Sequence, residues 1–264
     1  MNQNETKLTI LEASLRAVGR QNRAVETLDH FEAYIGTTLD WMQNFAVPCL
    51  PNPSDWTSPI SALVALFEER KRPLRLEYFH ELHPHLAVAL ESAGFACDRR
   101  DPVMALAAED LLNAHSAQSD GRLLNLEAQD EPQLRSFLRN QSIAYGGAGD
   151  ESSLGWLPNF ISGLKSGDLM VAAIEQEGQL IAGASIQIGG GIGELAGVWT
   201  LPAHRRQGHA YALCHYLLRQ YFAAGFEQCW LSAAEDAQEL YRRLGFVAIG
   251  VQLNYSYRSD GSDV

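Results

Sequence analysis

The sequence is poor in positive charge. Its 264 residues include 20 Lys and Arg against 32 Asp and Glu, which gives a formal net charge of −12. General binding to nucleic acid or to an anionic membrane requires a basic surface. We therefore expect neither nucleic acid nor a membrane as a partner, and the composition leaves room only for a local cationic site.

Long apolar runs and closely spaced cysteines are absent as well. No run approaches the roughly 18 apolar residues of a membrane span, and the start MNQNETKLTI lacks the basic and apolar regions of a signal peptide. Cys49, Cys97, Cys214 and Cys229 form no Cys-x-x-Cys pair. Such cysteines are typical of free thiols in a reducing compartment. We expect a cytoplasmic protein, and the spacing gives no support for a disulfide.

The length and one polar stretch predict two domains. At about 150 residues per domain, a chain of 264 residues suggests two. The segment 108–122 is polar and contains Asp120-Gly121, a turn signal. We place the boundary there, which gives domains over 1–120 and 121–264.

The periodicity of hydrophobic residues and the glycines at the ends of the expected elements predict alternating helices and strands, an α/β (α+β) fold. Gly94, Gly225 and Gly245 each follow a helical pattern, where glycine commonly ends a helix. We expect helices over 1–25, 60–70, 85–92, 131–141, 156–165, 213–222 and 237–244, and strands over 31–35, 44–47, 74–79, 95–106, 123–126, 169–175, 180–188, 192–200, 226–231 and toward Tyr257.

The two halves repeat one order of elements. When 151 is subtracted from the second-half numbers, VWTLP (198–202) falls on VPCLP (47–51). In the same way, LYRRLGF (240–246) falls on ALESAGF (89–95). Few letters are identical, so the order of elements carries the prediction of two copies of one fold.

The segment 198–210 combines a strand end, a short loop and a helix start. Arg205 and Arg206 are the only Lys or Arg residues between Ser166 and Leu218. A helix N-terminus offers unpaired N–H groups and the positive end of its dipole, and Gly208 lets the backbone approach a ligand closely. Two cations beside such a helix start predict a phosphate or pyrophosphate site.

Arg205-Arg206-Gln207-Gly208-His209-Ala210 resembles the (Gln/Arg)-x-x-Gly-x-(Gly/Ala) signature of the GNAT superfamily of N-acetyltransferases. Further along, Leu240–Phe246 is similar to the family's second signature, a Tyr four residues before Gly-Phe. The resemblance covers Arg122 to about Arg258. It implies two GNAT-like domains, each a mixed, mostly antiparallel sheet flanked by helices.

The resemblance also implies a site for acetyl-CoA, used as a cosubstrate without a metal. The molecule would lie where two neighbouring strands splay apart, with the main chain of Val198, Trp199 and Thr200 along its pantetheine arm. The Val198 N–H would polarise the thioester carbonyl and stabilise the oxyanion. The pyrophosphate would be held, mostly through backbone N–H groups, by Arg205, Arg206, Gln207, Gly208, His209 and Ala210.

Two residues are candidates for catalysis by this resemblance. Tyr241 would lie near the sulfur and supply a proton to the leaving thiolate; the alternative is a tyrosine packed at the edge of the core. An amine acceptor with a pKa of about 10.4 must lose a proton before it attacks. Glu194, eleven residues before Arg205, is the candidate base, as at a similar spacing in the histone acetyltransferases of the superfamily. The alternative for Glu194 is a solvated strand carboxylate.

The first half departs from the family pattern. Its counterpart of the loop, Pro53–Pro59, reads PSDWTSP without arginine or glycine, and Leu90 replaces Tyr241. We expect a degenerate copy that helps to shape the acceptor site.

The segment His80–His85 (HELHPH) looks like a metal motif, but Pro84 interrupts it and the spacing is not His-Glu-x-x-His. A polar loop is therefore expected there.

These observations predict transfer of an acetyl group from acetyl-CoA to a primary amine of a small-molecule or peptide acceptor. The attack would be direct, in a ternary complex, and the acidic composition favours a cationic acceptor. We expect a monomer or homodimer. A non-catalytic acyl-CoA-binding or sensing module is the main alternative, with Tyr241 merely structural, and a structural interaction domain is a third.

Overall fold

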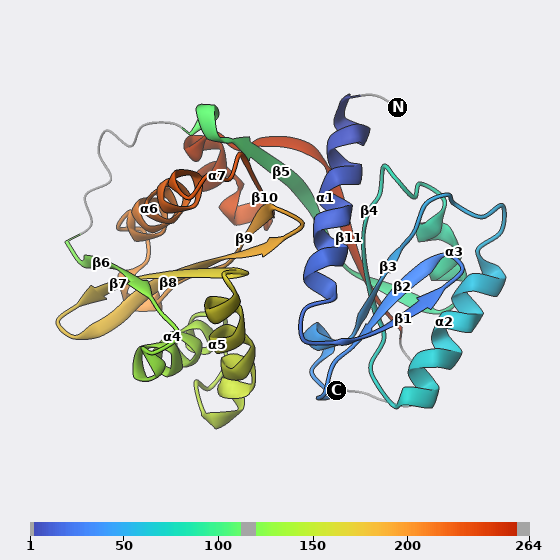
Figure 1. Cartoon of the computed structure of the whole chain (residues 1–264), viewed down its shortest axis with the longest axis horizontal. Helices are drawn as coiled ribbons and strands as arrows, with labels where there is room; N and C mark the ends of the chain where they lie inside the picture. The colour runs from blue at the N-terminus through green and yellow to red at the C-terminus, as the bar shows by residue number, and fades with distance from the viewer. Residues whose placement is uncertain (1–2, 112–119, 258–264) are drawn as a thin grey trace. The chain divides into compact units, whose positions relative to one another are not determined.

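The computed structural model describes residues 3–111 and 120–257, which form two compact units (Figure 1). The first unit takes in the described residues up to Met104, Ser232–Glu235 and the described residues from Ala248 onward. The second takes in Ala105–Leu231 and Asp236–Val247 as far as they are described. No helix of the described part is long and apolar enough to cross a membrane.

The first unit is a mixed sheet with helices packed against it. Along the chain run α1 (Gln3–Gly19), β1 (Ala24–Leu28), β2 (Phe31–Ile35), β3 (Phe45–Pro48), α2 (Thr57–Arg70), β4 (Arg75–Phe79), α3 (Leu86–Ser92), β5 (Phe95–Ala107) and, from the end of the chain, β11 (Val247–Tyr257). The strand order is β1-β2-β3-β4-β11-β5. β3 runs parallel to β4, while the β1–β2, β2–β3 and β4–β11 pairs are antiparallel.

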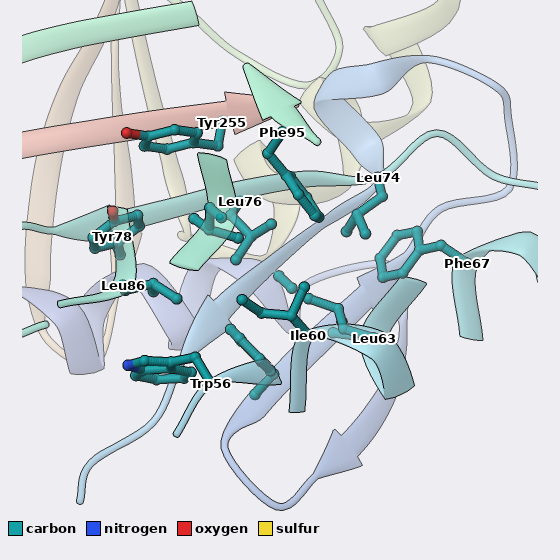
Figure 2. Packing of buried hydrophobic residues seen from close by; sticks show 14 of the residues in the cluster. Trp56, Ile60, Leu63, Phe67, Leu74, Leu76, Tyr78, Leu86, Phe95 and Tyr255 are labelled. Carbon is teal, nitrogen blue, oxygen red and sulfur yellow. The ribbon is translucent and has the colours of Figure 1, made fainter. Parts of the chain in front are cut away.

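Successive side chains along the strands of this unit point to opposite faces of the sheet, and each face carries its own hydrophobic cluster. Phe45 and Val47 of β3 pack with Tyr34 and with Leu15 of α1. Ala46, between them, belongs to a larger cluster with side chains of α2 and α3. Figure 2 shows this larger cluster, which includes Trp56, Ile60, Leu63, Phe67, Leu74, Leu76, Tyr78, Leu86, Phe95 and Tyr255. Because successive strand residues point to opposite faces, α1 covers one face and α2 and α3 cover the other.

The second unit has the same kind of sheet. Its elements are β6 (Arg122–Leu126), α4 (Glu131–Ala144), α5 (Leu157–Ser166), β7 (Leu169–Gln176), β8 (Gln179–Gly189), β9 (Ile192–Thr200), α6 (His209–Ala223), β10 (Gln228–Ser232) and α7 (Gln238–Leu244). The strand order is β10-β9-β8-β7-β6. β10 runs parallel to β9, and the other neighbours are antiparallel.

Helices lie on both faces of the second sheet, with α4 and α5 on one side and α6 on the other (Figure 1). Two glycines allow the close packing. A Cβ on Gly183 would lie 2.4 Å from the Phe137 ring of α4 and 2.5 Å from the Trp199 indole. A Cβ on Gly193 would lie 2.7 Å from the ring of Tyr221 in α6. Larger side chains at these positions would push the helices away from the sheet.

One element was predicted wrongly. The sequence predicts a helix over 1–25, but α1 ends at Gly19 and β1 begins at Ala24. β1 forms an antiparallel hairpin with β2. Gly19 packs against the ring of Tyr34, where a Cβ would lie at 2.5 Å, and Asn22 has a φ of +56° that a helix does not allow. These two positions end the helix before the predicted point.

The predicted repeat is confirmed at the level of elements. Subtracting 151 from His209–Ala223 of α6 gives 58–72, and α2 runs over 57–70. The same subtraction moves α7 from 238–244 to 87–93, where α3 occupies 86–92. β11 moves from 247–257 to 96–106, where β5 occupies 95–107. The order of elements therefore carries a structural repeat that few identical residues reveal.

The division of the chain is less simple than a cut at residue 121. Residues 112–119, beside the predicted boundary, lie outside the described part. At the C-terminal end, β11 pairs antiparallel with β4, with Leu253 opposite Tyr78 and Tyr255 opposite Leu76. The last strand of the second copy thus packs with the first copy, and the two packing units are not the two sequence halves.

Candidate functional site

β9 and β10 are paired at the start of β9. Cys229 lies opposite Gly193, and Trp230 lies opposite Glu194. β9 continues to Thr200, six positions further. The main chain around Val198 therefore lies beyond the stretch paired with β10, as expected for two strands that splay apart.

Gly197 and Val198 form a β-bulge within this segment. Across the β8–β9 pair, Ser185 faces Ala196 while Gly183 faces Trp199, so two residues of β9 lie opposite one of β8. Gly197 has a φ of +60°, in the left-handed region that glycine adopts without steric cost. A bulge turns the peptide groups of its strand away from the regular ladder. The Val198 N–H thus points in a different direction from the N–H groups of a regular strand.

Side chains hold the carbonyl groups of this bulge. Nε2 of Gln141 donates to the Gly197 carbonyl at 3.1 Å, and the Tyr145 hydroxyl donates to the Val198 carbonyl at 3.0 Å. The Ser185 hydroxyl donates to the preceding carbonyl of β9 at 3.1 Å. Three successive peptide groups at the predicted thioester site are therefore fixed by side chains.

The Arg205 side chain is used within the protein. Its Nε donates to the Thr200 carbonyl at 3.1 Å, and its Nη2 donates to the Ala144 carbonyl at 2.5 Å. These bonds fasten the loop to the end of β9 and to the last turn of α4. Arg205 can therefore serve an anion through its charge and main chain, while its donors hold the loop in place.

The start of α6 fits an anionic group. Arg206 is exposed with a φ of +63°, and Gly208 has a φ of +85°. Gly208 is the N-cap and makes no side-chain capping bond, and the Ala212 N–H bonds back to its carbonyl at 3.0 Å. The N–H groups ahead of Ala212, that of Ala210 included, precede this first helical bond, and such groups bind anions.

Gln207 and His209 stabilise the loop internally. Gln207 Nε2 donates to the Ala203 carbonyl at 3.3 Å, and its Oε1 lies 3.3 Å from Nε2 of His209. Burial lowers the pKa of His209, the neighbouring His204 lowers it further, and Asp120 opposes both. The environment thus favours the neutral imidazole, so His209 is a poor source of positive charge for a phosphate.

Trp199 contributes to the core rather than to a ligand surface. Its indole is buried and meets the Phe137 ring edge-on, with centroids 5.3 Å apart and an interplanar angle of 75°. Only its main chain is available for the predicted pantetheine contact. Thr200 pairs with Ala182 of β8 and is half-buried.

Tyr241 lies in α7 and is nearly buried, with 8% of its surface exposed. Its ring meets Phe246 edge-on at 6.0 Å. Burial raises the pKa of Tyr241, and Cys214, Tyr145 and Asp236 add to the effect. The hydroxyl therefore stays protonated in the physiological range, so it can donate a proton or a hydrogen bond and does not act as a phenolate base.

Glu194 is half-buried on β9, opposite Gln187 of β8 and Trp230 of β10. It lies four positions before Val198, which is about 13 Å along an extended strand. A proton released by an amine beside Val198 would have to travel through water to reach Glu194. The structure does not bring this predicted base into hydrogen-bond reach of the bulge.

The segment His80–His85, for which a polar loop was expected, contributes His83 to a buried hydrogen-bond network. His83 is buried, with Nε2 2.8 Å from the Glu12 carboxylate and Nδ1 2.5 Å from Oδ1 of Asn52. Arg16 Nη1 lies 2.8 Å from the same carboxylate and donates to the Pro48 carbonyl at 3.1 Å. Both ring nitrogens of His83 are used within the protein. Among the described residues, no group of three His, Cys, Asp or Glu side chains could hold a metal ion.

Gln141 and Tyr145 belong to the candidate site through their bonds to the bulge, although the sequence did not reveal them. They lie four residues apart at the end of α4, so both point toward one face of the helix. Asn140 also reaches the sheet, where its Nδ2 donates to the Leu180 carbonyl at 2.8 Å. Polar residues at helical spacing on the sheet-facing side were the available signal.

Comparisons with known proteins agree with the two signatures. A model of the acetyltransferase (GNAT) family matches residues 135–246, a range that contains both motifs and the α4 donors. A search of curated proteins finds no match. The family match thus lies in the second unit except for Ser232–Glu235.

Solved structures of similar fold cover nearly the whole chain. A GCN5-related N-acetyltransferase from Kribbella flavida aligns with a TM-score of 0.77 and 23% identity, covering 96% of this chain and 95% of that chain. A GCN5-related N-acetyltransferase from Sphaerobacter thermophilus gives a TM-score of 0.64 and 16% identity, covering 98% and 93%. A tandem GNAT protein from the clavulanic acid biosynthesis pathway gives 0.63 and 13%, covering 99% and 97%.

At these identities the likeness establishes the fold, and it extends through the N-terminal copy. Family and fold together support acyltransferase activity in general. By the family model, residues 135–246 form an acetyltransferase (GNAT) domain, and the chain shares the fold of a GCN5-related N-acetyltransferase over 96% of its length.

Proposed function

We propose that the second unit transfers an acetyl group from acetyl-CoA to the primary amine of a small-molecule or peptide acceptor. The observation that carries the proposal is the continuous path from the bulge at Val198, through the Arg205–Gln207 loop, to the start of α6. This path offers main-chain donors for an acyl group at one end and for a pyrophosphate at the other.

The reaction follows from this placement. The neutral amine attacks the thioester carbonyl, so that a C–N bond forms and the carbonyl oxygen gains negative charge. The Val198 N–H stabilises that oxyanion. The C–S bond then breaks, the amine proton leaves through water, and the CoA thiolate takes up a proton.

Tyr241 supplies the proton that the CoA thiolate takes up, and Glu194 accepts the proton that the amine loses. Tyr241 is protonated because its burial raises its pKa, so it donates toward the departing sulfur. Glu194 accepts the amine proton by way of water, since four strand positions separate it from Val198. The net charge of −12 favours a cationic acceptor.

The burial of Tyr241 favours a second candidate function. A phenol with 8% exposure that packs on Phe246 suits a core-edge residue as well as a proton donor. A non-catalytic acyl-CoA-binding or sensing module would keep the loop and the α6 start without turnover. Both candidates require acyl-CoA binding, and only the first requires thiol release.

Two measurements test these functions. Calorimetry with acetyl-CoA and with CoA should show binding, and Arg206→Ala should weaken it. An amine panel read by thiol release should then find an acceptor. Absence of binding at millimolar acetyl-CoA would sink both functions, whereas binding without release of thiol by any amine would favour the sensing module.

The compartment is part of the same proposal. The four cysteines are free, which is compatible with a reducing cytoplasm. Acetyl-CoA is supplied there, so we place the reaction in the cytoplasm.

A further inference from the structure

We propose that Gln141 is a positioning residue that sets the direction of the Val198 N–H for transition-state stabilisation. The inference rests on the proposed acetyl transfer. It concerns a side chain that lies outside both sequence signatures and donates a hydrogen bond to the Gly197 carbonyl.

The geometry of one peptide group carries the argument. In a planar trans peptide, the carbonyl of one residue and the N–H of the next point in opposite directions. Gln141 Nε2 donates to the Gly197 carbonyl at 3.1 Å. By holding that oxygen toward α4, Gln141 aims the Val198 N–H away from α4.

This restraint matters because the segment is irregular. Elsewhere in β9, ladder bonds to β8 fix the peptide planes, but Gly197 and Val198 share one partner residue on β8. Gly197 has a φ of +60°, and glycine has the widest range of backbone angles. A side-chain bond therefore replaces the ladder at the one peptide whose direction is important.

Gly197 and Gln141 fit each other closely. A Cβ at position 197 would lie 2.6 Å from Nε2 of Gln141. An alanine there would strain the backbone and also push the amide away from the carbonyl. The neighbouring bond from Tyr145 to the Val198 carbonyl, at 3.0 Å, fixes the next peptide in the same manner.

The position of Gln141 on α4 separates this role from simple packing. Its side chain is half-buried, whereas Leu134, Phe137 and Leu138 of the same helix supply the hydrophobic contact with the sheet. Asn140 anchors the helix to β8 through the Leu180 carbonyl. Loss of the Gln141 amide should therefore leave α4 attached and alter one peptide plane.

The test compares Gln141→Leu and Gln141→Glu in the full-length chain. Leucine has similar size and no donor, and glutamate donates only when protonated. The matched controls are Gln133→Leu and Gln133→Glu, because Gln133 is an exposed residue of α4. Hydroxylamine serves as the acceptor, since it is small and uncharged at neutral pH, and turnover is followed as thiol release.

We expect Gln141→Leu to lower kcat by about 10- to 100-fold, part of the loss seen when an oxyanion donor is removed outright. KM for acetyl-CoA and the affinity for CoA should change by less than about threefold, because the proposed contacts with the pyrophosphate do not involve Gln141. For Gln141→Glu, the rate relative to the parent should rise as pH falls toward about 4, where a glutamate carboxyl group gains a proton. The Gln133 variants should show neither effect.

A spectroscopic measurement does not depend on turnover. The carbonyl stretch of bound 13C-labelled acetyl-CoA should shift to lower frequency than in solution, because the Val198 N–H polarises it. Gln141→Leu should reverse much of that shift. A full shift and unchanged kcat in Gln141→Leu would overturn the positioning role while leaving acetyl transfer intact. An unshifted carbonyl in the parent protein, or no binding of acetyl-CoA, would instead reject the proposed function on which this role rests.

Discussion

The guanidinium of Arg205 donates to the carbonyl oxygen of Ala144, 61 residues earlier in the chain, at 2.5 Å. The first signature residue is thereby tied to the last turn of α4. Arg206, its neighbour, is exposed with a left-handed backbone. The two arginines of the motif therefore differ in what they do, and substitutions should separate them.

We expect Arg205→Ala to weaken both folding and CoA binding. It removes two hydrogen bonds to carbonyl groups, worth about 1 kcal/mol at an exposed site. For a chain of this size, that loss lowers Tm by about 2–4 °C. Arg206→Ala should weaken CoA binding and leave the Tm of the free protein unchanged.

Thermal unfolding with and without CoA provides the measurement. Arg219→Ala is the matched control, because Arg219 is exposed on α6, outside the motif. Equal Tm values for the free Arg205→Ala and Arg206→Ala proteins would contradict a structural role for Arg205.

Tyr241→Phe should lower kcat and spare CoA affinity. The substitution removes the hydroxyl and keeps the ring packed on Phe246. A lost general acid costs on the order of 10²-fold in rate. Burial raises the pKa of Tyr241, so the folded state favours the protonated phenol and the basic side of the pH–rate profile should not come from it.

Kinetics and near-ultraviolet absorbance check both parts. Tyr241→Phe should leave the position of the alkaline limb unchanged, and phenolate absorbance from Tyr241 should be missing at pH 10. Unchanged kcat in Tyr241→Phe would indicate a structural tyrosine and favour the sensing module.

The four thiols should react in a fixed order with a disulfide reagent. Cys97 is exposed and reacts first, while Cys49 is half-buried and its burial raises its pKa. Burial raises the pKa of Cys214 to about 12 and raises that of Cys229 as well. Since the thiolate is the reacting species, these two should react only after unfolding. Cys97→Ser should abolish the fast phase, and a fast phase that persists would contradict the assignment.

The sequence predicted what is encoded locally. β9 runs over Ile192–Thr200 as expected, because its apolar pattern lies between glycine-rich and proline turns. β1 escaped prediction because it is a mostly exposed edge strand without an alternating buried face. The lesson is that periodicity marks elements that bury one face.

The contacts that complete the site were beyond local patterns. Gln141 reaches Gly197 over 56 residues, and Arg205 reaches Ala144 over 61. In each bond the acceptor is a main-chain carbonyl, which every residue possesses. The residue type of the acceptor therefore cannot indicate the bond from the sequence. The signatures located the loop and the helix start, while the direction of the peptide groups required the fold.

The buried network of the first unit gives a prediction about stability alone. His83→Ala removes one partner of Glu12, whose carboxylate is fully buried and also contacts Arg16. Losing a hydrogen bond to a charged group costs about 1.5–3 kcal/mol. Denaturant unfolding should show this loss, and CoA affinity of the folded protein should stay the same. A loss below about 1 kcal/mol would mean that Arg16 alone compensates the Glu12 charge.

The N-terminal half should not fold on its own. A fragment over 1–120 lacks β11, which pairs with β4 from Gln252 to Ser256. Leu253 and Tyr255 of that strand are 1% and 2% exposed and belong to the main cluster of the first unit. Each such side chain contributes about 1.5–3 kcal/mol on burial, and the Tyr255 hydroxyl also donates to Glu91 at 2.8 Å.

Circular dichroism during heating checks this prediction. The fragment 1–120 should lack a cooperative transition, and co-expression with 121–264 should restore one because β11 is then supplied by the second fragment. The substitution Tyr255→Ala in 121–264 is the control, since it should weaken the restoration without touching 1–120. A cooperative melt of 1–120 alone, at the Tm of the intact chain, would contradict the dependence on β11, which arises because β4 finds its neighbour in the last strand of the chain.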